Sequence, residues 1–110
     1  MPVIEMRITE VTERMLAFLY KLFLREPEKS IVFEKLIDAI QPGIPDAFKL
    51  QMLNHMVAVR YVEVEGEKKV SIKNKVKIAY NGVMYYEHLQ KKYPKQIKKY
   101  DEFVESLRLS

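Results

Sequence analysis

The 110-residue sequence predicts a single α+β domain. Apolar residues recur at helical spacing over residues 8–60, and they alternate with charged residues over residues 61–80. Helical spacing then returns and continues almost to the C-terminus. We therefore expect three helices, a small antiparallel sheet and a C-terminal helical extension, with residues 1–82 forming the core of the domain and residues 83–110 the extension.

Composition narrows the class of protein. The chain has no cysteine, which leaves no disulfide framework, thiolate nucleophile or cysteine-based zinc site. Its apolar residues are interleaved with charged ones and never form the run of roughly 20 that spans a bilayer. The start of the chain shows no secretory signal, so we expect a cytoplasmic protein with no membrane partner. Frequent Lys, Glu, Tyr and Ile are compatible with a thermophilic source.

The first helix is expected to start near Thr9 or Thr12, because either side chain can cap it. Glu26-Pro27 should end it. Its apolar positions follow helical spacing and are Ile8, Val11, Met15, Leu16, Leu19, Leu22 and Phe23.

Two more helices are expected before the alternating segment. Gln41-Pro42-Gly43 should end the second helix. Pro45 and Asp46 suit the first turn of the third, which runs to about Arg60. The apolar positions are Phe33, Leu36, Ile37 and Ile40 in the second helix, and Phe48, Leu53, Met56 and Val57 in the third.

The alternating segment predicts an antiparallel hairpin or a three-stranded meander. Residues 61–65, 70–73 and 76–80 are the candidate strands, with turns at Gly66-Glu67 and Asn74-Lys75. Asn81-Gly82 is expected to close the sheet. One face should then present Val and Ile to the core, and the other should carry lysines.

The C-terminal extension carries an apolar stripe with the spacing of a coiled-coil seam. Pro94 should divide it into two helical segments. We expect the stripe to form the interface of a homodimer through Tyr86, Leu89, Tyr93, Ile97, Tyr100, Val104 and Leu107.

Charge is unevenly distributed along the chain. The net charge is +4, and ten lysines but only one acid, Glu87, lie between Lys68 and Lys99. Such a segment suits a polyanion, because each lysine placed on a phosphate releases a counterion. A solvated lysine face is the other interpretation. The lysines expected to contact a DNA backbone are Lys68, Lys69, Lys73, Lys75 and Lys77.

Several of these features together resemble a winged helix-turn-helix domain. They are Gly43-Ile44-Pro45 in the turn, Leu53 and Met56 in the third helix, and the segment 61–66 that follows it. The likeness covers about residues 9–89 and extends to small archaeal and archaeal-virus regulators with a C-terminal dimerisation helix. The resemblance implies double-stranded DNA as the partner and the third helix as the recognition helix.

The resemblance places the recognition surface on Asp46, Ala47, Leu50 and the candidate base contacts. Amide side chains there can pair with the edge of adenine in the major groove. Only one basic residue lies along this helix, which leaves sequence-specific recognition open. The candidate base contacts are Lys49, Gln51, Asn54 and His55.

No enzyme, cofactor, metal site or small-molecule substrate is expected. The two histidines, His55 and His88, lack partners at the spacing of a metal pair. Glu63 and Glu65 have no general acid beside them, and three glycines cannot build a phosphate-binding loop.

The leading hypothesis is a homodimeric transcriptional regulator. One alternative is a protein-interaction module that uses Leu50 and Met52 of the third helix as its contact surface. The other is a sequence-neutral architectural DNA binder that uses the lysines of the hairpin. Free basic residues on the third helix would favour the regulator.

Overall fold

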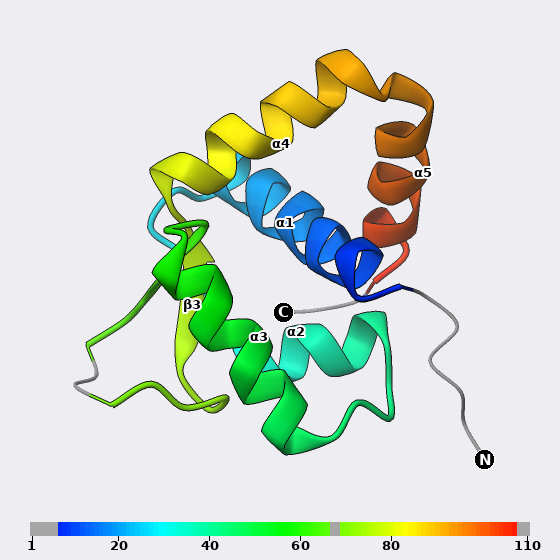
Figure 1. Ribbon diagram of the computed structural model, residues 1–110. Coiled ribbons are helices and arrows are strands. Elements are labelled where there is room, and N and C mark those ends of the chain that lie inside the picture. Colours follow the sequence, from blue (N-terminus) through cyan, green and yellow to red (C-terminus); the bar gives the residue numbers. More distant parts are fainter. Residues whose placement is uncertain (1–6, 67–68, 108–110) are drawn as a thin grey trace.

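A computed structural model describes residues 7–66 and 69–107 (Figure 1). It confirms the α+β class, with helices around a small antiparallel sheet. The elements in chain order are α1 (Ile8–Arg25), β1 (Ile31–Val32), α2 (Phe33–Ile40), α3 (Asp46–Ala58), β2 (Val62–Val64), β3 (Lys75–Ile78), α4 (Tyr80–Lys92) and α5 (Pro94–Glu105).

Helix α1 lies in the middle of the molecule and packs against α2, α4, α5 and β3 (Figure 1). Most of its apolar side chains are buried, and Met15 and Leu16 are fully buried, but Phe23 is 39% exposed near the end of the helix. It begins at Ile8, before either threonine expected to cap it, and no side chain caps its start. Within the described residues, no helix is both long and apolar enough to cross a membrane.

The sheet has the order β1-β3-β2, and both pairings are antiparallel. Val76 of β3 lies opposite Ile31 on one side and Val64 on the other, so β3 is the central strand. The expected strand at residues 70–73 is wrong. That segment turns instead, with the Ser71 amide donating to the Asn74 side chain at 2.8 Å.

The third strand is β1, which directly precedes α2. Its two residues were not expected to form a strand, because a run of two cannot show alternation. The chain continues from β1 directly into α2. The first two amides of α2 donate hydrogen bonds to the loop before β3: Phe33 N–H to the Asn74 carbonyl and Glu34 N–H to the Ile72 carbonyl, both at 2.9 Å. These bonds fix α2 against the loop between β2 and β3.

Helix α3 buries a slightly different face from the one expected. Leu53 and Met56 are buried as predicted, but Met52 is also buried, whereas Phe48 is 36% exposed. Met52, Leu53 and Met56 share one side of the helix, which faces the core, and Phe48 lies one turn before Met52, in the first turn of the helix. Gly43, in the turn before α3, has a φ of 94°, a conformation that glycine adopts without strain.

Asn81-Gly82 does not close the sheet as expected, because α4 already begins at Tyr80. Gly82 is buried, and a Cβ atom there would collide with the backbone carbonyl oxygen of Tyr61. The glycine therefore allows α4 to pass close to the chain that enters β2, instead of making a turn.

Pro94 separates α4 from α5, as predicted, and the two helices fold back over α1 (Figure 1). This packing corrects the expected dimer interface, because the stripe joins the core of the single chain. Five of its seven side chains are at most 7% exposed, Leu107 is partly buried, and Tyr93 alone is 50% exposed. The five are Tyr86, Leu89, Ile97, Tyr100 and Val104.

Candidate nucleic-acid interface

The exposed face of α3 carries two amide side chains. Gln51 and Asn54 are both exposed and lie three residues apart, on one side of the helix. His55 is exposed beside them, and Ala47 precedes them by one turn. The packing of Met52, Leu53 and Met56 in the core holds the opposite side of α3. The structure therefore brings three of the four candidate base contacts to one accessible surface.

Lys49 does not belong to that surface, which corrects its expected role as a base contact. Its side chain is 7% exposed, and its Nζ lies 2.7 Å from Asp38 Oδ1 and 3.2 Å from Asp46 Oδ1. Glu34 Oε2 is 3.9 Å away. The hydrogen bond to Asp38 raises the pKa of the Lys49 ammonium, against the opposite effect of burial. The one lysine of α3 is thus occupied within the protein.

The loop between β2 and β3 carries fewer free lysines than the sequence indicates. Lys69 and Lys75 are exposed and form no ion pair with the described residues. Lys73 pairs with Glu34 of α2. Lys77 is partly buried and lies opposite Glu63 in the strand register. Lys68 lies outside the described residues.

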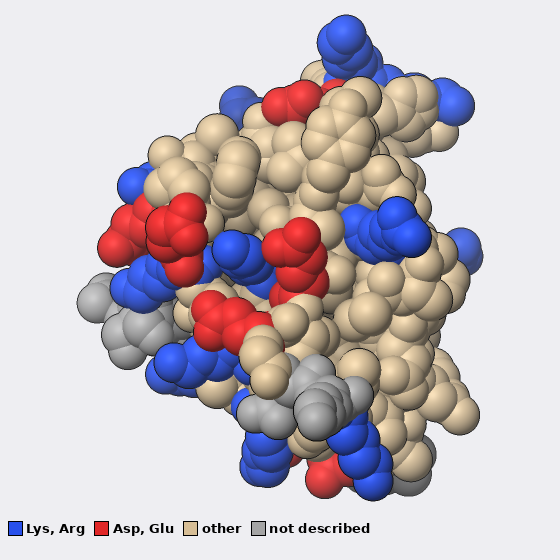
Figure 2. Space-filling view, turned by 90° about the vertical axis from the view of Figure 1, so that its left-hand side faces the viewer, with Lys and Arg blue, Asp and Glu red and all other residues tan. Residues whose placement is uncertain are grey.

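Acidic side chains accompany the lysines of this hairpin. Figure 2 shows Lys and Arg interspersed with Asp and Glu on the face that carries it. Glu65 accepts a hydrogen bond from the Ser30 hydroxyl at 2.7 Å, which fixes one of these carboxylates beside the sheet. The surface of the hairpin is therefore mixed in charge rather than uniformly basic.

Arg60 is a basic residue near α3 that sequence analysis treated only as a helix end. It is exposed, follows α3 by two residues and has a φ of 62°. A non-glycine residue in this left-handed region is uncommon and costs some backbone strain. Its charge and its position directly after the third helix were the available signals.

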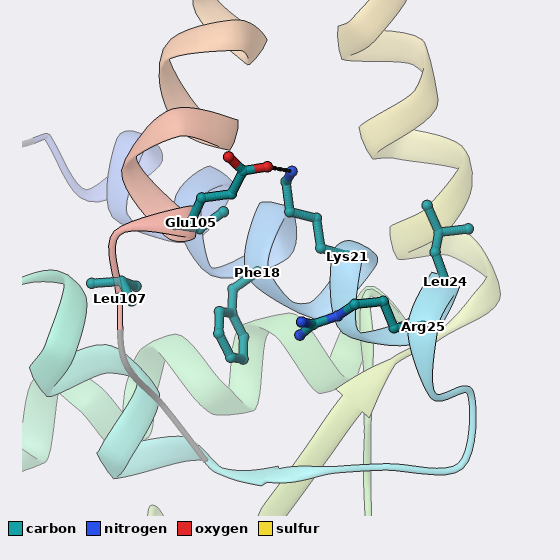
Figure 3. Close-up of a pocket in the computed structure, with 7 residues that line it drawn as sticks. Phe18, Lys21, Leu24, Arg25, Glu105 and Leu107 are labelled. Carbon is teal, nitrogen blue, oxygen red and sulfur yellow. Dashed lines mark hydrogen bonds and ion pairs between the residues drawn. The ribbon is translucent and has the colours of Figure 1, made fainter.

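A hollow of about 360 Å³ lies between α1 and α5 (Figure 3). Lys21 of α1 reaches across it to Glu105 of α5 at 2.7 Å, and this bond lowers the pKa of Glu105. The Arg25 guanidinium points toward the ring of Phe18. The hollow therefore has apolar walls and the guanidinium of Arg25, and the carboxylate of Glu105 is already paired with Lys21. Among the described residues, no group of three or more His, Asp or Glu side chains could hold a metal ion.

No protein-family model, curated protein or solved structure matches this chain.

Proposed function

We propose that this chain is a winged helix-turn-helix protein that binds double-stranded DNA, with α3 in the major groove and the β2–β3 hairpin beside the phosphate backbone. The order of the elements supports this proposal. A turn at residues 41–45 joins α2 to α3, and a two-stranded hairpin follows α3. These are the elements that the resemblance in the sequence implies.

The observation that carries the proposal is the exposed amide pair on α3. The amide nitrogen of a Gln or Asn side chain can donate to N7 of adenine while its oxygen accepts from the N6 amino group, a bidentate pairing at the major-groove edge of the base. Gln51 and Asn54 present two such amides on one side of a helix whose other side is fixed in the core.

Affinity must come from outside α3, because Lys49 is buried in ion pairs. Lys69 and Lys75 of the hairpin segment are exposed, and so is Arg60, which directly follows α3. If each neutralises one phosphate, the slope of log affinity against log salt concentration is about −2.7 for one chain. We do not extend the proposal to a homodimer, because the stripe expected to form its interface is buried within one chain.

Selection from a randomised duplex DNA pool tests the proposal, with binding measured across a salt series. Wild type should enrich one motif, and Gln51→Ala with Asn54→Ala should relax the preference by about 1–3 kcal/mol for each bidentate pairing that the substitutions remove. Gln90→Ala removes one amide side chain from α4, outside the proposed interface, and serves as the control. Equal motif preference in wild type and the α3 variant would reject α3 as the recognition helix.

A protein-interaction module is the second candidate function, and one observation favours it. Phe48 is 36% exposed and Leu50 is only partly buried, on a helix whose one lysine is already paired. Met52, expected to share this contact surface, is buried and cannot contribute. Failure to bind duplex DNA at low salt would favour this candidate. Binding without enrichment of a motif would favour an architectural DNA binder.

A further inference from the structure

Among the described residues, the junction of α4 and α5 has more exposed lysines without an ion pair than the β2–β3 hairpin does. We call it the α4–α5 corner and define it as residues 91–99. All five of its lysines are exposed, and none forms an ion pair with the described residues. In Figure 1 the corner lies at the top of the molecule, at the opposite end from α3. The lysines are Lys91, Lys92, Lys95, Lys98 and Lys99.

The stability of the fold does not explain three of these lysines. Lys91 and Lys92 occupy the last turn of α4, where a cation is favourable. Lys95, in contrast, lies in the first turn of α5, which contains no acid. Lys98 and Lys99 follow it by three and four residues, a spacing at which like charges on a helix repel, and neither forms an ion pair with Glu102 further along the helix. An external anion would relieve this repulsion.

A hollow of about 260 Å³ adjoins the corner, and it is lined by Tyr93, Gln96, Ile97, Leu89, Glu13 and Tyr100. Tyr93 is 50% exposed, and the Lys92 ammonium lies 5.6 Å from the centre of its ring. The ring thus combines an accessible aromatic surface with a cation beside it, which are the two elements that bind bases and phosphates in single strands.

Polar groups of the hollow are ordered by hydrogen bonds within the protein. The Tyr100 hydroxyl donates to Glu13 at 2.7 Å and accepts from the Gln96 amide nitrogen at 3.0 Å. Within the described chain, the side-chain oxygen of Gln96 accepts no hydrogen bond. It is therefore a fixed acceptor beside Tyr93, able to bond an imino or amino group of a base.

We propose that the α4–α5 corner binds single-stranded nucleic acid. Phosphates lie along Lys95, Lys98 and Lys99, and one base enters the hollow, where it stacks on Tyr93 and donates to Gln96. A duplex fits less well, because its bases are stacked on each other and show no free face. An anionic membrane also fits less well, because Tyr93 is the one large apolar side chain that the described corner exposes.

This second site goes beyond the proposed duplex contact and does not depend on it. A test measures the fluorescence anisotropy of a labelled oligothymidylate of about 12 nucleotides, a length within the range that such sites cover. Lys95→Gln, Lys98→Gln and Lys99→Gln together should weaken binding at least tenfold and reduce the salt slope by about 2. Lys69→Gln, Lys75→Gln and Lys77→Gln together remove equal charge from the hairpin and should leave binding to the oligonucleotide within about twofold.

Tyr93 provides the second arm of the test. Tyr93→Ala should weaken binding by roughly 5- to 150-fold, because base stacking is removed, whereas Tyr93→Phe should bind as wild type. Circular dichroism of each variant checks that the fold is intact. We expect it to be intact, because Tyr93 is half-exposed and contributes little to the core. An unchanged affinity in Tyr93→Ala would overturn the single-strand site, and so would an equal weakening of binding in the two lysine variants. Binding to anionic vesicles but not to the oligonucleotide would also overturn it.

The same variants separate this inference from the proposed function. Gln51→Ala with Asn54→Ala should bind the oligothymidylate as wild type does, because α3 lies at the other end of the molecule. Wild-type protein that binds the oligothymidylate but enriches no duplex motif would reject the duplex contact and leave the corner site supported. The reverse result would reject the corner alone.

Discussion

The ammonium group of Lys49 holds carboxylates of α2 and α3 together. Asp38 and Glu34 come from α2, and Asp46 lies one turn before Lys49 on α3. Glu34 also pairs with Lys73 of the loop before β3, so the cluster connects three parts of the chain. Because the Lys49 side chain is only 7% exposed, its charge would be costly without these partners.

Lys49→Met is expected to lower the free energy of unfolding by about 1–3 kcal/mol, because the three carboxylates would lose their common partner. Partial exposure of Asp38 and Asp46, 45% and 74%, keeps the effect below that of a fully buried pair. Urea denaturation measures it. Lys35→Met, at an exposed site on α2, is the matched control and should change stability by less than about 0.5 kcal/mol.

DNA selection on the same variant separates structure from recognition. Since Lys49 is absent from the exposed face of α3, motif preference should be unchanged in Lys49→Met. If Lys49→Met had a weaker motif preference but unchanged stability, Lys49 would have to contact a base. Sequence analysis could find the amides of Gln51 and Asn54, because their residue types suit base contacts. It could not find this ion cluster, since the partners of Lys49 on α2 are set by how the helices pack.

At the scale of elements, the spacing of apolar residues predicted the long helices. It did not predict the structure of short segments, such as residues 70–73, whose conformation depends on local contacts. Helix α2 begins and ends where its apolar spacing and Gln41-Pro42 indicate. Residues 70–73 alternate like a strand, yet β1 occupies the place beside β3 that a third strand would take. Gly82 shows the same limit, because a glycine that permits close packing inside a helix has the same sequence signal as a turn.

The apolar stripe of α4 and α5 correctly predicted which side chains are buried. It did not predict that they pack against the rest of the same chain instead of a second copy. A spacing of three and four residues is shared by coiled-coil seams and by helices that pack within one chain. Pro94 decides between them, because the break lets α5 turn back onto α1 (Figure 1). The position of that turn in space is a tertiary property, which one sequence does not reveal.

Ile97→Ala should therefore destabilise the folded chain itself. Ile97 is 4% exposed between α5 and its neighbours, and truncating a buried Ile costs about 2–5 kcal/mol. Urea denaturation measures the destabilisation, and it should not vary with protein concentration. Ile97→Val, which removes one methylene, should cost only about 0.5–1.5 kcal/mol. A variant of unchanged stability whose mass by light scattering falls from dimer to monomer would restore the dimer interface.

At the scale of the whole molecule, tyrosine hydroxyls connect α1 with α4 and α5. Tyr85 and Tyr100 both donate to Glu13, at 2.9 and 2.7 Å. Tyr86 donates to Asp101 at 2.8 Å, and Tyr20 donates to Glu87 at 2.8 Å. These four bonds cross between different helices. They require neutral hydroxyl groups, so they depend on pH.

Burial is the main cause that raises the pKa of these tyrosines. It acts with the carboxylate partners to raise the pKa of Tyr20 and of Tyr100 to about 12, although the Gln96 hydrogen bond to Tyr100 opposes the shift. Burial and Asp101 raise the pKa of Tyr86 further above its ordinary value. The neutral form is thus favoured more in the folded chain than in the unfolded chain, whose tyrosines titrate near pH 10.

Stability from these bonds should be complete below about pH 10 and should fall as the pH rises toward 12, because the unfolded chain releases its tyrosine protons first. Urea denaturation at steps from about pH 8 to about pH 11.5 measures the fall. Tyr86 is fully buried, so Tyr86→Phe should make the fall shallower by up to about 1.4 kcal/mol per pH unit. Tyr80→Phe, at a site 75% exposed, is the matched control and should keep the wild-type slope. Equal slopes in wild type and Tyr86→Phe would mean that lysine deprotonation, rather than this network, governs alkaline unfolding.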